Sequence, residues 1–272
     1  MRLLLVIRAF SPQGLRPALA GVRTACGLFV LLLLLTAIPA QAGTLSVVGR
    51  DTWAKVEKEY DGDTFRTTDG EKVRLLGIDA PELAHSAERG EPLGPKSKHF
   101  LQGLIEGKLV RLKRDKEKRD RYGRQLSHVY LRDGTWVNGA MVSEGLALVY
   151  TFAPNLHFAN DLLRLEKAAR DQKLGIWATS RFRVLQSTSV SNNHIGQFRL
   201  VQGEVTQTDK NGYGFRLDSL NISIPRKYRA YFKKAPNIRK VQQVLVRGTI
   251  RTSNGKLFLA LHSPFDLEII KP

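Results

Sequence analysis

The segment Asp61-Gly62-Asp63-Thr64 lies ten residues before a second segment, Arg74-Leu75-Leu76-Gly77-Ile78-Asp79-Ala80-Pro81-Glu82. Between them, strand-like runs at 64–67 and 72–78 are joined by Asp69-Gly70, which predicts a β-hairpin. If these strands pair across that turn, Asp63 and Asp79 lie at the same end of the sheet. The hairpin therefore predicts a fold in which two carboxylates converge.

Two carboxylates at one end of a sheet repel each other unless a cation lies between them. Calcium suits this position because it accepts hard oxygen ligands in a loose geometry, and the carbonyl of Ala80 with water could complete its shell. An Asp-Gly-Asp turn is, however, also typical of a simple hydrogen-bonded turn. The turn alone leaves both interpretations open.

Glu82 and two arginines could supply the remaining chemistry of a phosphodiester site. Glu82 follows Pro81, whose fixed φ pre-sets the loop, and a carboxylate beside a metal can accept a proton from water. Arg74 and Arg124 suit the extra negative charge of a five-coordinate phosphate, because a planar guanidinium donates two parallel hydrogen bonds. The alternative for any single arginine in so basic a chain is a solvated surface charge.

These segments, together with Asp120-Arg121-Tyr122-Gly123-Arg124, resemble the staphylococcal nuclease (thermonuclease) family from Val56 to Trp177 in order, spacing and residue type. The resemblance implies a calcium-dependent phosphodiesterase that releases 3′-phosphate products. The implied metal ligands are Asp63, Asp79 and the carbonyl of Ala80; the implied catalytic residues are Arg74, Glu82 and Arg124; the implied substrate-binding residues are Arg121, Tyr122 and Tyr150.

Two positions depart from the pattern of that family. Phe152 stands where its best-known member has a second tyrosine, which removes a hydroxyl near the substrate, and Ala80 replaces a threonine that acts through its backbone. Tyr150 remains available to stack on a base. Neither departure removes a group on which the chemistry depends.

The first 42 residues have the pattern of an export signal. Four arginines precede an apolar run at 28–35, and Ala40-Gln41-Ala42 follows, which predicts cleavage before Gly43. The protein is therefore expected to be secreted or periplasmic, with transient membrane association before cleavage; the alternative is an uncleaved anchor. The only cysteine, Cys26, lies in this segment, so thiolate-bound zinc and disulfides are not expected in the mature chain.

The charge of the chain favours a polyanionic partner. The formal net charge is +18, and the four arginines of the first 42 residues account for four of these, which leaves +14. Such an excess attracts nucleic acid and accelerates its binding. DNA and RNA are the expected partners, and no protein partner is evident; adhesion to an anionic envelope surface is the alternative.

The mature chain divides into a nuclease-like domain at 45–180, a linker at 187–194 and an OB-like domain at 197–272. In the first domain we expect strands at 45–48, 53–57, 64–67, 72–78, 109–113 and 125–131, and helices at 95–106, 138–144 and 155–173, with Asn155 as an N-cap. This is the outline of an α+β domain built on a five-stranded OB-type barrel with three helices. The three tryptophans, Trp53, Trp136 and Trp177, adjoin apolar runs and are expected in the core.

The second domain alternates strands and turns. We expect strands at 200–206, 214–217, 221–225, 244–250 and 257–261, with hairpin signals at Asn211-Gly212 and Asn254-Gly255. This spacing predicts a smaller, all-β, OB-like domain. Its aromatic residues Tyr213, Phe215, Tyr228, Tyr231 and Phe232 are interleaved with basic residues, which is typical of a single-strand-binding surface, although they could equally form the core.

The predicted function is a secreted or periplasmic, calcium-dependent nuclease that hydrolyses DNA and RNA with low sequence specificity. A different class of protein is a catalytically inactive nuclease-fold protein of the cell envelope that only binds nucleic acid. A third is a structural envelope protein whose charge is adhesive. Cleavage of DNA by the protein distinguishes the enzyme from both.

Overall fold

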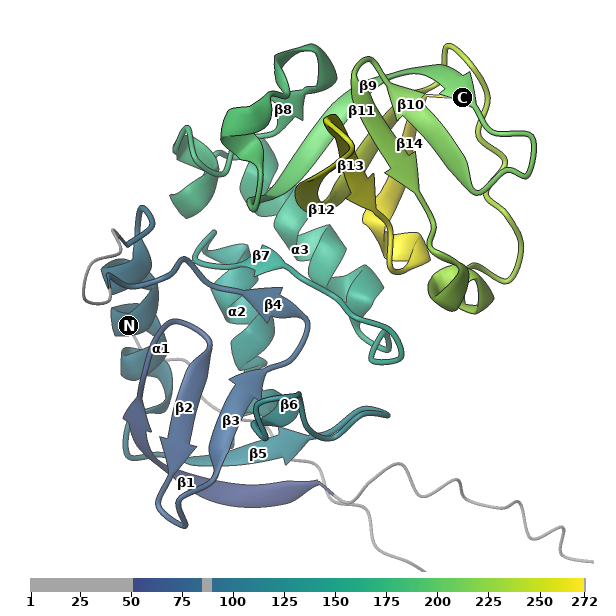
Figure 1. Ribbon diagram of the computed structural model, residues 1–272. Coiled ribbons are helices and arrows are strands. Elements are labelled where there is room, and N and C mark those ends of the chain that lie inside the picture. The colour runs from purple at the N-terminus through teal and green to yellow at the C-terminus, as the bar shows by residue number, and fades with distance from the viewer. Residues whose placement is uncertain (1–50, 85–89, 272) are drawn as a thin grey trace, which may run out of the picture. The chain divides into compact units, whose positions relative to one another are not determined.

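The Asp69-Gly70 turn joins β2 (Thr64–Thr67) to β3 (Lys72–Leu75) in an antiparallel hairpin, as the sequence predicts. The structure is a computed structural model that describes residues 51–84 and 90–271. In it, both strands belong to a closed five-stranded barrel with the strand order β1-β2-β3-β6-β5 (Figure 1). The other three strands are β1 (Thr52–Glu59), β5 (Leu109–Lys113) and β6 (Gln125–Tyr130). Because β3 and β6 run parallel and the other pairs are antiparallel, this is the strand order of an OB-type barrel.

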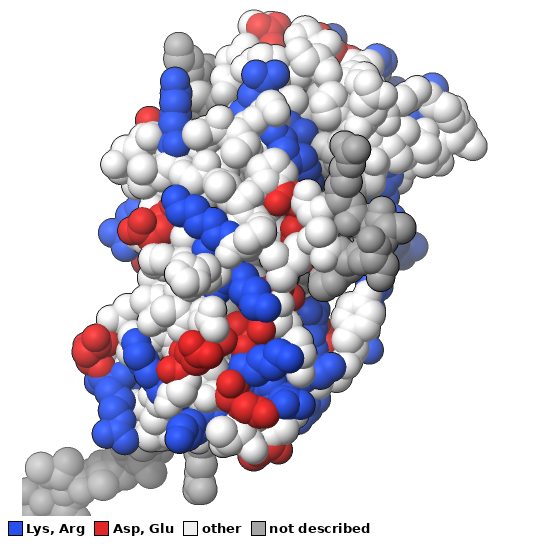
Figure 2. All heavy atoms as spheres, turned by 90° about the vertical axis from the view of Figure 1, so that its left-hand side faces the viewer, with Lys and Arg blue, Asp and Glu red and all other residues white. Residues whose placement is uncertain are grey.

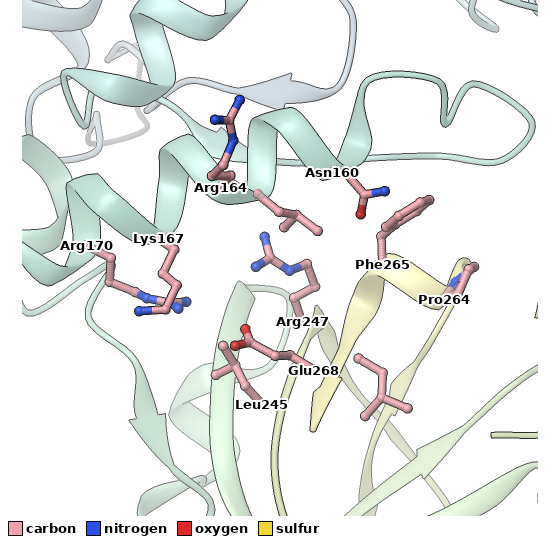
Figure 3. A pocket seen from close by; sticks show the side chains of 11 residues that line it. Asn160, Arg164, Lys167, Arg170, Leu245, Arg247, Pro264, Phe265 and Glu268 are labelled. Carbon is pink, nitrogen blue, oxygen red and sulfur yellow. The ribbon is translucent and has the colours of Figure 1, made fainter. Parts of the chain in front are cut away.

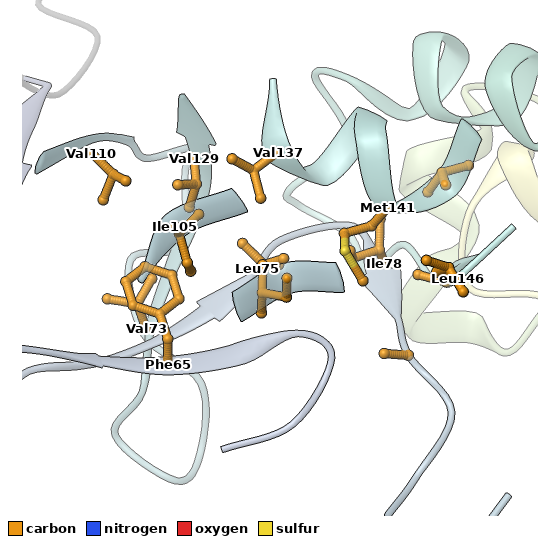
Figure 4. Close-up of a cluster of buried hydrophobic side chains, with 14 of the residues drawn as sticks. Phe65, Val73, Leu75, Ile78, Ile105, Val110, Val129, Val137, Met141 and Leu146 are labelled. Atoms are coloured by element: carbon orange, nitrogen blue, oxygen red, sulfur yellow. The ribbon is translucent and has the colours of Figure 1, made fainter. Parts of the chain in front are cut away.

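Side chains that alternate along these strands fill the barrel (Figure 4). Phe65, Val73 and Val110 are fully buried, and Leu75 is 1% exposed. The period of two places these residues on the inner face of each strand. Trp53 contradicts the sequence-based expectation, because it lies on the outer side of β1 and is 50% exposed.

Three α-helices pack against the core of the first barrel. They are α1 (Gly94–Ile105), α2 (Val137–Ser143) and α3 (Ala159–Asp171). A 3-10 helix, η1 (Gly175–Ala178), follows, so the first domain has four helices in the described part of the chain and not the expected three. No helix in residues 51–84 and 90–271 is long and apolar enough to cross a membrane.

Two predicted elements differ from those in the structure. The strand expected at 72–78 is interrupted, because Gly77 adopts a φ of 83° and the chain leaves the barrel as β4 (Ile78–Asp79), which pairs with β7 (Leu148–Val149). Asn155 does not cap α3. Its side chain instead holds both the N–H and the carbonyl of Glu117, at 2.7 and 2.9 Å, and Phe158 occupies the cap position.

The second domain is also a closed five-stranded barrel. Its strands are β9 (Phe198–Thr208), β10 (Gly214–Leu217), β11 (Leu220–Ser223), β12 (Gln243–Ser253) and β13 (Lys256–Ala260). The order β9-β10-β11-β13-β12 closes through the pairing of β12 with β9, and β11 runs parallel to β13. The two barrels therefore share one topology, as the predicted OB-like fold requires.

Further segments extend this second sheet. β14 (Leu267–Lys271) pairs with β12, and β8 (Leu185–Gln186) pairs with β9. Short 3-10 helices, η4 (Arg226–Phe232) and η5 (Pro264–Asp266), lie between strands.

The segment 187–194, expected to be a linker, is structured and packs on the second barrel. It forms η2 (Ser187–Ser189) and η3 (Asn192–His194), and the side chains of Ser187 and Val190 are buried. The predicted export signal at 1–42 and the strand at 45–48 lie outside the described residues.

The barrels pack together within one compact unit, Ser46–Pro272. A buried apolar cluster joins them, with Leu148, Ile176 and Trp177 from the first domain and Leu200 and Leu245 from the second. This contact fixes the second barrel beside β7, the strand that pairs with β4.

Candidate active site

Asp63 lies at the start of β2, where the backbone fixes its position. Its carbonyl accepts the N–H of Leu75 at 2.8 Å, and its carboxylate accepts the N–H of Ala80 at 2.8 Å and the hydroxyl of Thr64 at 3.0 Å. The side chain is 7% exposed, which is rare for a carboxylate without a cationic partner. That partner is the guanidinium of Arg74.

Arg74 joins the two predicted metal ligands. It pairs with Thr64 across the hairpin, and its guanidinium forms ion pairs with both Asp63 and Asp79, the latter at 2.6 Å. Asp79 reaches this point because β4 leaves the barrel and is held by β7, with Asp79 opposite Leu148. The convergence expected from the hairpin is therefore present, with an arginine between the carboxylates.

Asp61 is a third carboxylate at this end of the barrel, and the sequence predicted it only as part of a turn. Its Oδ1 accepts the N–H groups of Asp63 and Thr64, at 2.9 and 2.7 Å, and so shapes the turn. Burial raises its pKa, while Arg74 and Arg124 oppose that rise. Gly62 is required here, because a Cβ at this position would overlap the buried side chain of Ser97 on α1.

Glu82 lies on the loop between β4 and α1. Its N–H donates to the carboxylate of Glu91 at 3.2 Å, and its carbonyl accepts the N–H of Glu91 at 2.8 Å. Gly94, the first residue of α1, lets the helix approach this loop, because a Cβ there would lie 2.6 Å from the carbonyl oxygen of Glu82. Partial burial raises the pKa of Glu82, as do the nearby charges of Asp79 and Asp61, which makes it a stronger base near neutral pH.

Arg124 reaches the site from the turn before β6. Its Nε donates to Asp120 at 2.7 Å, and its Nη1 donates to Thr64 Oγ1 at 3.3 Å. Asp120 also accepts the backbone N–H groups of Tyr122 and Arg124, at 2.9 and 3.0 Å, so this carboxylate fixes the whole turn. Asp120 was not among the predicted site residues, although it is part of the Asp-Arg-Tyr-Gly-Arg segment.

The predicted substrate-binding residues fall into two groups. Tyr122 is 68% exposed at the tip of the turn, with the guanidinium of Arg121 4.7 Å from its ring and that of Arg124 5.4 Å away. Tyr150 lies on the other side, after β7, where its N–H donates to the carbonyl of Gly77 at 2.9 Å. Burial and the charge of Asp79 raise the pKa of its hydroxyl.

The described residues fit a calcium ion in the chemistry of their donors. Within residues 51–84 and 90–271, no three acidic, histidine or cysteine side chains form a ready metal-binding group. Asp63 and Asp79 nevertheless converge on one cationic group, and their oxygens are hard donors of the kind that calcium binds. The backbone at Ala80 contacts Asp63, so its carbonyl and water could supply further ligands.

Figure 2 shows lysine and arginine side chains spread over one face of the molecule, with acidic side chains among them. A cavity of about 510 Å³ lies elsewhere, between α3 and the second barrel, and Figure 3 shows Arg247 pointing from the second barrel toward α3, whereas the side chain of Arg164 points to the opposite side of α3. None of the predicted site residues lines this cavity.

An OB-type barrel that gathers carboxylates and arginines at one end defines a class of protein suited to phosphate chemistry. Residues 72–179 match the family model described as "Staphylococcal nuclease homologue". The chain is 33% identical over 125 residues to the thermonuclease of Staphylococcus intermedius, which is 45% of this chain and 74% of that protein. It is 32% identical over 143 residues to the thermonuclease of Staphylococcus hyicus, covering 52% of this chain and 83% of that protein.

A Bacillus subtilis (strain 168) relative named endonuclease YncB is 33% identical over 132 residues, which is 47% of this chain and 62% of that protein. The chain belongs to the staphylococcal nuclease family, as the resemblance of its motifs predicts.

Proposed function

We propose that this protein is a calcium-dependent endonuclease that hydrolyses phosphodiester bonds of DNA and RNA with low sequence specificity. Membership of the family and the names of its relatives, thermonuclease and endonuclease, support nuclease activity. One observation carries the proposal: β2, β3, β4, the Glu82 loop and the Arg124 turn bring their polar side chains to one end of the barrel. Hydrogen bonds and ion pairs link Asp63, Arg74 and Asp79, and Arg124 joins them through Thr64.

Glu82 is the proposed general base. Its raised pKa lets it accept a proton from the water that attacks phosphorus. Arg74 and Arg124 would donate hydrogen bonds to the phosphate oxygens as negative charge develops. Asp63, Asp79 and the carbonyl of Ala80 would hold calcium, which supplies positive charge beside the phosphate when it is bound.

The ion pairs of Arg74 give this proposal a specific consequence. In the structure its guanidinium forms ion pairs with Asp63 and Asp79. With calcium held by those two carboxylates, Arg74 would be free to donate hydrogen bonds to the phosphate. Arg121, Tyr122 and Tyr150 are the proposed contacts to the rest of the nucleotide, with Tyr150 placed to stack on a base.

The alternative function is a nucleic-acid-binding protein that has lost the reaction. The presence of both aspartates, Glu82 and both arginines favours the enzyme, because binding alone does not need a general base. We also propose export through the segment 1–42, which places the enzyme outside the cytoplasm; fractionation of cells that produce the full chain tests this, and recovery in the cytoplasmic fraction overturns it.

A cleavage assay on the full chain distinguishes enzyme from binder. The chain should degrade single-stranded DNA and RNA, while Glu82→Gln should bind the same strands and cleave them far more slowly. Arg66→Lys is a matched control, because Arg66 lies on β2 but pairs with Glu57 at the surface, at 2.6 Å. Binding without cleavage by the parent would favour the alternative.

A further inference from the structure

A row of four aromatic rings crosses from the candidate active site to the second barrel. Tyr150 contacts Phe152 with ring centroids 4.8 Å apart, Phe152 contacts His262 at 5.3 Å, and His262 contacts Tyr228 at 4.5 Å. We call these four side chains the aromatic row. Its first member is a predicted substrate contact, and its last two belong to the second barrel.

The aromatic row is accessible to a ligand. Phe152 is 39% exposed, and Tyr150, His262 and Tyr228 are partly exposed. Large exposed rings are otherwise costly in a soluble protein, and a contiguous group of them is typical of a binding site. The loop that carries Phe152 follows β7, and the loop that carries His262 follows β13 (Figure 1).

Basic side chains accompany the row. Lys227 lies over the ring of Tyr228, with Nζ 4.7 Å from its centroid. The exposed side chain of Arg251 on β12 lies near enough to lower the pKa of His262, together with Lys227, although burial is the largest cause of that shift. Burial and these neighbours disfavour the charged form of His262, so the positive charge beside the row comes from Lys227 and Arg251.

The other aromatic residues of the second barrel have a different position. Phe215 and Phe232, which the sequence could place either in a binding surface or in the core, are buried in the barrel core at 3% and 9% exposure. Tyr213 packs against that core and against Arg229. Tyr231 is 38% exposed but takes part in none of the ring contacts of the aromatic row, so the candidate binding surface is the group of rings that is continuous with Phe152.

We propose that Phe152, His262 and Tyr228, with Lys227 and Arg251, form an extended binding track for single-stranded nucleic acid, which holds the strand beyond the nucleotide at the cleavage site. The exposed surfaces of these packed rings would contact the bases of the strand, and the two basic side chains would contact the backbone phosphates. The phenyl ring of Phe152, which lacks the hydroxyl of a tyrosine, suits stacking in this position. This inference rests on the proposed nuclease function, because that function places the cleavage site beside Tyr150.

The test compares affinities for a long and a short strand, measured by fluorescence anisotropy in excess chelator so that no cleavage occurs. The probes are a labelled 20-nucleotide single-stranded DNA and a labelled trinucleotide. Tyr228→Ala, His262→Ala and Lys227→Ala are made in the full chain. Tyr231→Ala is the matched control, because Tyr231 lies on the same 3-10 helix and is 38% exposed but makes none of these ring contacts.

Tyr228→Ala and His262→Ala should each lower the ratio of long-strand to short-strand affinity about tenfold. Lys227→Ala should lower long-strand affinity mainly at low salt and reduce the salt slope by about one. Tyr228→Phe should bind like the parent, since the ring and not the hydroxyl stacks, and Tyr231→Ala should also bind like the parent. Equal melting temperatures establish that the variants are folded.

An unchanged affinity ratio in Tyr228→Ala and His262→Ala would overturn the track, as would an equal loss in Tyr231→Ala. If either variant fails to fold, Lys227→Ala tests the track instead, because Lys227 is exposed and its substitution should leave the fold intact. An unchanged salt dependence of long-strand affinity in Lys227→Ala would then overturn the proposal. The affinity ratio is measured without cleavage, so it tests the binding track separately from the reaction. A chain without nuclease activity would refute the proposed function, but its affinity ratio would still support or refute the track.

Discussion

Arg247 of the second barrel donates a hydrogen bond to Glu166 of α3 at 2.7 Å, and the side chains of the two residues are 6% and 1% exposed. Glu166 also accepts the N–H of Val149 on β7 at 2.7 Å. This buried ion pair therefore ties the second barrel to the strand that holds β4 and Asp79. It makes the second barrel part of the structure that supports the candidate site.

Removal of Arg247 should destabilise the protein strongly. Arg247→Ala leaves the carboxylate of Glu166 buried without its cation, which costs about 3–5 kcal/mol. The double variant Glu166→Leu, Arg247→Met should cost much less than the sum of the single variants, because no charge remains unpaired. Urea unfolding measures both, with Arg216→Ala, an exposed arginine on β10, as a control. Additive effects of the two substitutions would contradict the coupling.

Stability should also fall in mild acid because of His128. Its ring is 2% exposed and packs against Trp136 and Phe158, and burial lowers its pKa to about 3, with smaller contributions from Lys113 and His157. Below pH 6.5 the unfolded chain binds a proton that the folded chain does not. The free energy of unfolding therefore falls by about 2 kcal/mol from pH 7 to pH 5 on account of this group.

The variant His128→Phe isolates this contribution, because it keeps a ring in the same packing site. The difference between parent and variant in the free energy of unfolding should change with pH in the window between 6.5 and 3, in the direction that favours the variant at low pH. A difference that stays constant from pH 7 to pH 5 would show that His128 titrates normally.

The proposed catalytic residues should tolerate no conservative exchange. Glu82→Gln removes the base, and Arg124→Lys removes the bidentate geometry, so each should lower kcat by roughly a hundredfold, which corresponds to about 3 kcal/mol. The melting temperature should stay close to that of the parent. Arg66→Lys should retain full activity, and parental turnover in either active-site variant would remove that residue from the mechanism.

Glu91 should act as a positioning residue for Glu82. Its carboxylate accepts the N–H of Glu82 and also pairs with Arg181 at 2.5 Å, and Arg181 donates to the carbonyl of Phe198 in the second barrel at 3.4 Å. Arg181→Ala should therefore lower kcat several-fold with little change in KM, because the loop that carries the base is held less firmly. Arg164→Ala removes only a surface pair with Asp161 and should have no effect. A change confined to KM would assign Arg181 to binding.

Local patterns were enough to predict most strands. The bounds of β2, β5 and β10 agree with the predicted ranges, because hairpin turns and a period of two specify them. The break at Gly77 was missed, although a glycine inside a strand-like run can mark a bend, because the pairing of β4 with β7 that draws the chain away leaves no local signal. Trp53 was misplaced because an apolar neighbourhood in the sequence does not specify whether a barrel strand directs a given side chain into the core or toward the outer surface.

The residue types of the candidate site were predictable from the sequence, but the ion pairs and hydrogen bonds between those residues were not. The motifs placed Asp63, Arg74 and Asp79 together, and the structure adds that the arginine neutralises both aspartates. Glu91 carried no sequence signal, because its role depends on a loop contact with Glu82. Arg247 likewise pairs with Glu166, which lies 81 positions earlier in the sequence, and local sequence periodicity does not predict contacts at that separation.

DNA cleavage by the full chain in calcium, in magnesium and in excess chelator, with Glu82→Gln run in parallel, tests the proposed calcium-dependent hydrolysis most directly. The parent should cleave in calcium, turn over little in magnesium, which requires a strict octahedral shell, and stop in chelator. Glu82→Gln should be nearly inactive in all three. Full activity of the parent in chelator, or parental activity of Glu82→Gln in calcium, would contradict the account.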